Sequence, residues 1–119
     1  MLINYQDGES QLLNLAIRDT TAHPSSSNDI RGYVRKALYI NNDLNQSVSI
    51  QIQGCFKDST TAADWVNIGT AQTVNADTKA IIGEKEIDTL KNYFPYIRVT
   101  ATCSTAPNAD SLTVNLMVG

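Results

Sequence analysis

Apolar and polar residues alternate with a period of two in several separate segments of the chain. The clearest is residues 46–54, where Val48, Ile50 and Ile52 are separated by serine and glutamine. Successive side chains of a β-strand point to opposite faces, so this pattern predicts a strand with one buried face. The same alternation recurs in four further segments: residues 11–20, 33–41, 96–103 and 111–118.

The inward positions expected from this alternation are mostly aliphatic. They are Leu13, Leu15, Ile17, Val34, Leu38, Ile40, Ile97, Val99, Ala101, Cys103, Leu112, Val114, Leu116 and Val118, with Lys36 interrupting the second segment. Weaker strand signals lie at residues 65–69 and 78–83. Strands with one apolar face each need a second sheet to cover them. We therefore expect an all-β fold, a two-sheet antiparallel β-sandwich of jelly-roll or immunoglobulin-like topology, forming one domain over residues 1–119.

Turn-forming residues separate the predicted strands. The Asn/Asp-rich residues 41–46 and the "APNAD" segment at 106–110 are typical of hairpin connections. The polar residues 22–29 are long enough to cross from one sheet to the other, and 57–64 form a second exposed loop. In residues 84–94 the apolar spacing changes to three and four, which predicts one short helical turn near 84–92 at an end of the sandwich.

The composition limits the classes of partner. Only 18% of residues are charged, the net charge is −3, and the nine Lys and Arg residues are scattered singly. Without a basic stripe the chain is not expected to bind nucleic acid. No apolar run is long enough for a membrane span, and "MLINYQDGES" lacks the pattern of a secretory signal, so we expect synthesis in a cytoplasm and no membrane partner.

The residues that could carry chemistry are few and dispersed. The one histidine, His23, precedes a proline in a polar loop, where a structural role is favoured over a catalytic one. The acidic clusters Asp7/Glu9, Asp58/Asp64 and Glu84/Glu86/Asp88 match neither a glycosidase pair nor a calcium loop, and no glycine-rich phosphate loop is present. We predict a protein that is not an enzyme and that holds no cofactor and no metal.

Cys55 and Cys103 match no metal or redox spacing. Two readings remain for them: buried free thiols that pack as small apolar side chains, which we favour, or a disulfide.

The aromatic residues give the first candidates for a surface site. Trp65 begins a predicted strand, and Tyr93 and Tyr96 flank Pro95. Trp65 has three readings: a lid over the core, a contact with a partner, or part of a stacking platform for sugars. Arg98 is alone in an otherwise uncharged strand, where it could make a specific contact or pair with an acidic loop residue.

The outward positions of the clearest strands carry almost no charge. They are Ser47, Ser49, Gln51, Gln53, Thr100, Thr102, Thr113 and Asn115. An exposed sheet usually places charges outward, so this neutral face favours burial against another copy or another protein. The alternative is a solvent-exposed Ser/Thr face, as in many extracellular sandwiches. Residues 1–10 could form either a short edge strand of the same sandwich or an N-terminal arm that adds Leu2, Ile3 and Tyr5 to such a contact. The candidate interface residues are therefore Leu2, Ile3, Tyr5, Trp65, Tyr93, Tyr96, Arg98 and Thr100.

Three segments together resemble a known module. "SIQIQG", then "DWVNIG", then "PYIRVTATCSTAPNADSLTVNLMV" look like a β-sandwich common among tailed-bacteriophage virion proteins, in which "VQ-x-QGS", "W-x-x-IG" and "PY-x-R-x-x-x-T" recur. The match covers about residues 33–118. A galactose-binding-like sandwich is a second, looser resemblance.

The resemblance implies a non-enzymatic virion component made in the host cytoplasm. Its role would be that of a capsid decoration (cement) protein or a small fibre or tail accessory, present in many symmetric copies or as a homo-oligomer. The implied partner is the major capsid protein or another virion protein. The alternative is a carbohydrate-binding module or adhesin, with a glycan as ligand near Trp65 and Tyr96.

Overall fold

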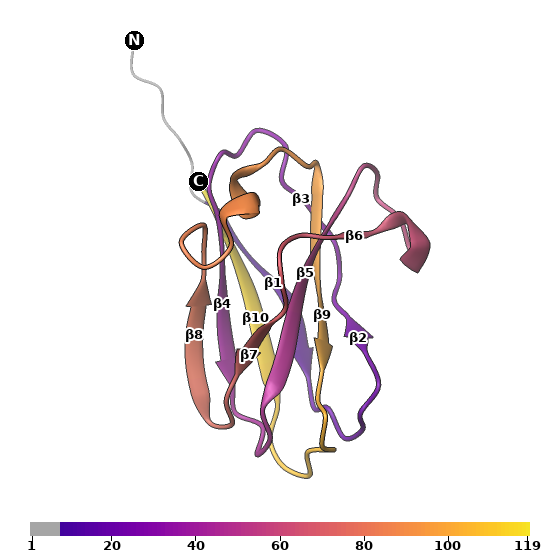
Figure 1. Cartoon of the computed structure of the whole chain (residues 1–119), viewed down its shortest axis with the longest axis vertical. Helices are drawn as coiled ribbons and strands as arrows, with labels where there is room; N and C mark the ends of the chain where they lie inside the picture. Colours follow the sequence, from indigo (N-terminus) through magenta and orange to yellow (C-terminus); the bar gives the residue numbers. More distant parts are fainter. Residues whose placement is uncertain (1–7) are drawn as a thin grey trace.

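β-Strands and their connections make up nearly all of residues 8–119, the part of the chain that the computed structural model describes (Figure 1). One sheet has the order β1 (Gly8–Leu15), β10 (Leu112–Val118), β4 (Lys36–Asn42) and β8 (Thr78–Ile82). The other has the order β2 (His23–Pro24), β9 (Tyr96–Thr102), β5 (Val48–Cys55) and β6 (Val66–Asn67). In that second sheet β3 (Asn28–Asp29) also pairs with β9, and β7 (Gln72–Val74) with β5. All pairings are antiparallel, which confirms the predicted two-sheet sandwich.

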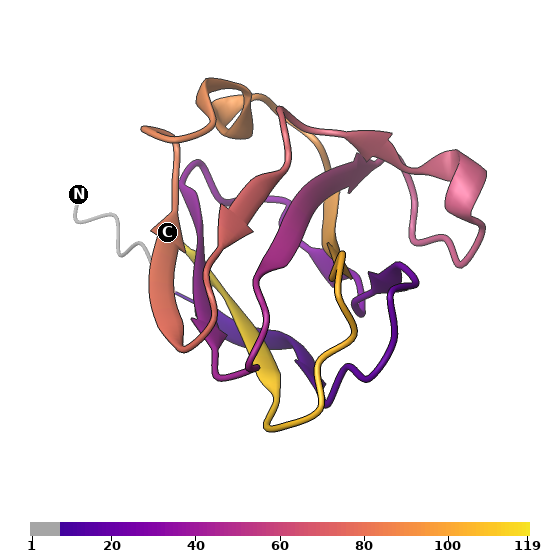
Figure 2. The same ribbon diagram turned by 60° about the horizontal axis from the view of Figure 1, so that its bottom comes forward.

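The strand order decides between the two topologies that the sequence left open. If β2 with β3, and β6 with β7, each count as one interrupted strand, the chain occupies eight strand positions. The sheets then contain positions 1-8-3-6 and 2-7-4-5, so that neighbours within a sheet are mostly distant in sequence. This interleaving is that of a jelly roll. Figure 2, turned so that the bottom comes forward, shows the two layers facing each other.

Two connections predicted as hairpins cross between the sheets instead. Residues 41–46 join β4 to β5, and residues 106–110 lie between β9 and β10, and each pair of strands belongs to opposite sheets. Asn42, fully buried, holds the first crossing together. Its Nδ2 donates to the carbonyls of Gln46, Val74 and Asn75 at 3.0–3.1 Å, and its Oδ1 accepts from the Leu44 amide at 3.1 Å. Asn and Asp residues thus stabilise a crossing as readily as a hairpin.

Residues 22–29, predicted as a loop that crosses between the sheets, stay within one sheet. These residues form the short strands β2 and β3, which pair along one edge of β9, with His23 opposite Ala101 and Asn28 opposite Ile97. The chain changes sheets before and after this segment, between β1 and β2 and between β3 and β4.

The core lies between the two sheets and contains the inward residues that the alternation predicts. β4, β5 and β10 show regular alternation of buried and half-buried positions. Eleven central residues are at most 1% exposed: Leu38, Ile40, Val48, Ile50, Ile52, Ile97, Val99, Ala101, Leu112, Val114 and Leu116. Full burial of one such aliphatic side chain stabilises a fold by about 1.5–3 kcal/mol.

The predicted pattern is wrong at two strand starts. In β1 the register shifts between Gln11 and Leu13, and this irregularity turns Leu12 into the core, while Leu13 and Leu15 are only partly buried. Before β4, Val34 is 68% exposed, and the next inward position is taken by Lys36, at 5%. The Lys36 Nζ donates to the Asn92 carbonyl at 3.0 Å and lies 4.7 Å from the centre of the Phe94 ring.

A short 3₁₀ turn, η2 (Asp88–Lys91), covers one end of the sandwich, as the change of spacing at 84–94 predicts. Ile87, Leu90 and Phe94 are all buried. Gly54 leaves room for the Phe94 ring, because a Cβ at that position would lie 2.9 Å from Cδ2 of Phe94. The turn therefore acts as a lid that closes the core at this end.

We expect Gly69→Ala to destabilise the protein by about 2–3 kcal/mol in urea unfolding. Gly69 has a φ of +69°, and an added Cβ would lie 2.5 Å from Cγ2 of Ile87, so backbone strain and a clash combine. Gly32→Ala is the control: Gly32 has a φ of +89° but no atom within 4 Å of the added Cβ. It should cost only about 1 kcal/mol. Equal losses in the two variants would contradict this role of Ile87.

Lys36 should make the free energy of unfolding depend on pH in the alkaline range. Burial lowers the pKa of Lys36 below its ordinary value of 10.5, and the charge of Glu84 only partly opposes this. Between the lowered pKa and 10.5 the unfolded chain binds more protons than the folded one, so the free energy of unfolding rises with pH. We expect the wild type to gain stability relative to Lys36→Met across this window. The exposed Lys79→Met is the control, and parallel pH profiles for wild type and Lys36→Met would be inconsistent with a buried ammonium.

Candidate functional site

The predicted interface residues within 8–119 lie on the side of the second sheet, the one that contains β5 and β9. Tyr96, Arg98 and Thr100 point outward from β9, since Ile97 and Val99 between them are buried in the core. Trp65 precedes β6, and Tyr93 follows η2. Leu2, Ile3 and Tyr5 lie outside the described residues.

The neutral outward residues form a hydrogen-bonded network around Gln53. Its Oε1 accepts from Nε of Arg98 at 2.8 Å and from Oγ1 of Thr100 at 3.1 Å, while its Nε2 donates to Oδ1 of Asn67 at 3.0 Å. Gln51 Nε2 donates to the carbonyls of Ile52 and Gly69. These neutral side chains are half-buried, and the chain itself satisfies many of their polar groups.

The predicted neutral face is not one surface. Ser49, Gln51, Gln53, Thr100 and Thr102 belong to β5 and β9, whereas Thr113 and Asn115 belong to β10 in the opposite sheet. The two groups therefore lie on opposite outer faces of the sandwich, and no single partner surface can cover both.

The loop of residues 56–65, which contains the 3₁₀ turn η1 (Ala62–Asp64), projects beside β6 (Figures 1 and 2) and carries Trp65. The indole Nε1 of Trp65 donates to the Ser59 carbonyl at 3.1 Å, and the Cys55 thiol donates to the Asp64 carbonyl at 3.2 Å. Cys55 and Trp65 are buried but stand outside the main core cluster. The loop thus adds a second, small layer over the end of β5.

Arg98 lies against this small layer. It is 8% exposed, and its guanidinium carbon lies 4.6 Å from the centre of the Trp65 ring. Burial lowers the pKa of Arg98 from its ordinary value, although an arginine stays charged. Within residues 8–119 it forms no ion pair, so the predicted pairing with an acidic loop residue is wrong for this part of the chain.

A groove of about 390 Å³ opens over Arg98 and Trp65. Residues 24–27 form one wall, and Asp58, Ser59 and Thr60 form the other. Asp58 closes one rim, where its Oδ1 accepts from Oγ of Ser27 at 2.7 Å. We refer to this feature as the Arg98 groove.

Next to it lies a set of apolar side chains, which we call the apolar surface: Phe56, Val66 and Tyr93, which are exposed, and Tyr96, which is half-buried. Phe56 is 92% exposed and Tyr93 is 80% exposed. Two grooves of about 300 and 230 Å³ run between them, both lined by Phe56, Tyr93 and Pro95. Asp58 lines the first of these and also the Arg98 groove, so the two features adjoin at this residue.

The sequence predicted Tyr93 and Tyr96 in this surface but missed Phe56 and Val66. Phe56 directly follows β5, and the period-two pattern ends there. No local signal tells an exposed phenylalanine at a strand end from a buried one.

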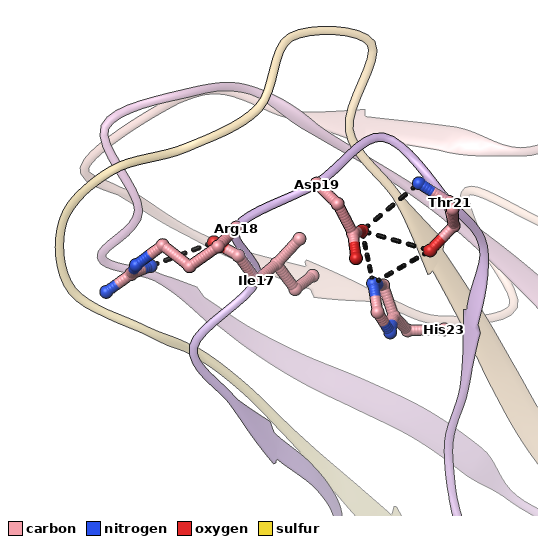
Figure 3. A network of polar contacts seen from close by, with 5 residues as sticks. All are labelled: Ile17, Arg18, Asp19, Thr21 and His23. Atoms are coloured by element: carbon pink, nitrogen blue, oxygen red, sulfur yellow. Dashed lines mark hydrogen bonds and ion pairs between the residues drawn. The ribbon is translucent and has the colours of Figure 1, made fainter.

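His23 belongs to a local network and not to a catalytic arrangement (Figure 3). Its Nε2 lies 2.7 Å from Oδ1 of Asp19 and 3.4 Å from Oγ1 of Thr21. Hydrogen bonds from His23 and Thr21 lower the pKa of Asp19. A catalytic relay requires the acid and the nucleophile on different ring nitrogens, whereas here both contacts fall on Nε2.

A further groove, of about 630 Å³, lies at the end of the other sheet between Gly8, Ala37, Gly83 and Gly119. It brings together none of the predicted interface residues of the described range. Across residues 8–119 no three His, Cys, Asp or Glu side chains are grouped to hold a metal ion, and no helix could cross a membrane.

Comparison with known proteins finds solved structures with a similar fold. No protein-family model matches the chain, and no curated protein matches it in sequence. The chain is similar to the PBSX exported protein XepA, with a TM-score of 0.67 and 14% identity, over 94% of this chain and 37% of that one. It is also similar to PirA, with a TM-score of 0.52 and 13% identity, over 99% and 97% of the two chains.

A third similar structure is a chain of the T13 IBDV viral particle, with a TM-score of 0.51 and 10% identity, over 95% of this chain and 30% of that one. At such identities the likeness concerns the fold alone, and the chain spans little more than a third of XepA. The resemblance drawn from the sequence is thus supported at the level of the fold and not at the level of a family.

Cysteine reactivity should report on the 56–65 loop. Both cysteines are free and buried, but Cys55 lies under the loop, whereas Cys103 lies in the main core and burial raises its pKa. Because opening one loop costs less than global unfolding, we expect Ellman's reagent to modify Cys55 (in Cys103→Ala) faster than Cys103 (in Cys55→Ala). Equal rates, both matching global unfolding, would show that the loop and the core open together.

Proposed function

We propose that this chain is a non-enzymatic structural protein of a bacteriophage particle, acting as a capsid decoration (cement) protein. The observation that carries the proposal is the apolar surface. Phe56 and Tyr93 are 92% and 80% exposed beside two grooves, and neither side chain belongs to the hydrophobic core. The fold supports it, since the PBSX exported protein XepA and a chain of the T13 IBDV viral particle have a similar fold.

Aromatic and arginine side chains dominate the binding energy of protein interfaces. Phe56, Tyr93 and Tyr96 lie together with Arg31, whose guanidinium carbon is 5.6 Å from the centre of the Tyr96 ring. An interface of about 1,600 Å² built around such anchors can be strong. A decoration protein that bridges coat subunits would stabilise the shell, because the shell must break these contacts before it opens.

The proposed partner is the major capsid protein or another virion protein, contacted by many symmetric copies, whose repetition adds avidity. Leu2, Ile3 and Tyr5 would extend the contact as an N-terminal arm. Synthesis in the host cytoplasm followed by residence in the virion fits this role.

We favour a particle component over a carbohydrate-binding module because of Trp65. Sugar platforms need an accessible aromatic face, and Trp65 is 7% exposed with Arg98 stacked on its ring. Its structural role as a lid over the end of β5 accounts for its position.

Co-sedimentation with purified phage particles tests the proposal. We expect the wild-type protein to pellet with particles that lack it, and the double variant Phe56→Ser/Tyr93→Ser to bind at least about tenfold more weakly, since each anchor contributes about 1–2 kcal/mol or more. Ile81→Ser is the matched control, because Ile81 is 59% exposed on β8 in the other sheet. A wild-type protein that stays in the supernatant at micromolar concentration would refute the proposal.

A further inference from the structure

Arg98 is a buried cation whose hydrogen-bonding capacity is only partly used. Its Nε donates to Gln53, and within residues 8–119 this is the one hydrogen bond of its guanidinium. The two terminal nitrogens therefore have no partner there, and no carboxylate lies within ion-pair distance. The terminal nitrogens are not among the side-chain polar atoms of residues 8–119 that are sealed from solvent without a partner. At 8% exposure, however, the charge is only partly hydrated, and a ligand carboxylate would supply the missing counter-ion.

The surroundings of Arg98 fix its position. The Trp65 ring lies against the guanidinium, and Gln53 holds its Nε from the sheet. The Arg98 groove is the open space beside it. A guanidinium held in this way presents its two free nitrogens as a fork, which matches the two oxygens of a carboxylate.

We propose that the Arg98 groove is a carboxylate-binding site that receives an Asp or Glu side chain of a partner protein. Asp58 at the rim favours a single negative charge, because its carboxylate repels a doubly charged phosphate more strongly than a carboxylate. Thr60 also lines the groove and can hydrogen-bond the flanking peptide, whereas the hydroxyls of Ser25 and Ser27 already donate to the Ser26 carbonyl and to Asp58.

The neighbouring surface favours a protein over an acidic sugar as the source of this carboxylate. Trp65 has no free face on which a pyranose ring could stack. The apolar surface adjoins the groove through Asp58, so one partner segment can place an acidic residue on Arg98 and apolar residues against Phe56 and Tyr93. The identification of the partner as a virion protein rests on the proposed function; the carboxylate site does not.

The test uses the full chain and NMR, with Nε–H of Arg98 and the indole Nε1–H of Trp65, the one tryptophan, as reporters. The probe is the blocked tripeptide acetyl-Ala-Glu-Ala-amide, compared with acetyl-Ala-Gln-Ala-amide. We expect saturable shifts of both resonances with the Glu peptide, at a Kd in the millimolar range (about −4 kcal/mol). Binding of the Gln peptide should be at least about tenfold weaker, and equal binding of the two would overturn the site.

Variants locate the binding in the groove. Arg98→Gln should abolish the shift at Trp65, and Arg98→Lys, which keeps the charge but loses the fork, should weaken binding several-fold. Asp58→Asn keeps the oxygen that Ser27 contacts and removes the repelling charge, so it should tighten binding about two- to fivefold. Arg35→Gln is the matched control, since Arg35 is exposed and lines the separate groove at the end of the other sheet. An unchanged affinity in Asp58→Asn would place the anion outside this groove.

Two competing anions complete the test. Glucuronate or inorganic phosphate binding more tightly than the Glu peptide would overturn the assignment to an acidic protein side chain.

Co-sedimentation of Arg98→Gln separates this inference from the proposed function. If the wild type and Arg98→Gln bind particles equally, the particle role stands and the carboxylate contact fails. If neither the wild type nor Arg98→Gln binds particles but the wild type still binds the Glu peptide, the carboxylate site stands and the virion partner is refuted.

Discussion

Each sheet of this sandwich can remove its apolar face from water only against the other sheet, and the rest of the structure follows from this constraint. The four-stranded sheet and the β5–β9 sheet contribute inward Ile, Leu and Val side chains to one core. η2 closes one end with Leu90 and Phe94, and Asn42 links the β4–β5 connection to the β7–β8 connection. Because the interior is filled, recognition is left to the loops and outer faces.

The 56–65 loop turns one of these outer faces into a candidate site. By folding over the end of β5 it buries Cys55 and Trp65 and lays an aromatic ring against Arg98. The same loop leaves Phe56 exposed at its start. A sandwich whose sheets position a binding loop is a common arrangement in binding proteins, and here the loop combines an apolar surface with the guanidinium of Arg98.

The jelly roll itself does not define the function. This architecture occurs in viral capsid proteins, lectins and other classes, and the similar structures found here share only 10–14% identity with the chain. The choice between a particle component and a sugar-binding module depends on single side chains. The burial of Trp65 and the exposure of Phe56 and Tyr93 favour the particle component.

The sequence by itself determined that Val48, Ile50, Ile52, Ile97 and Val99 face a common core, and that residues near 84–92 form a turn. Both follow from the spacing of apolar residues, because that spacing reflects the local backbone geometry of a strand or a helical turn. Only the tertiary structure decided that residues 41–46 and 106–110 cross between sheets, since strands of either sheet carry the same period. It likewise decided that Lys36 points inward, that Phe56 is exposed and that Arg98 stacks on Trp65. These features arise from contacts between residues far apart in the chain, which no local pattern encodes.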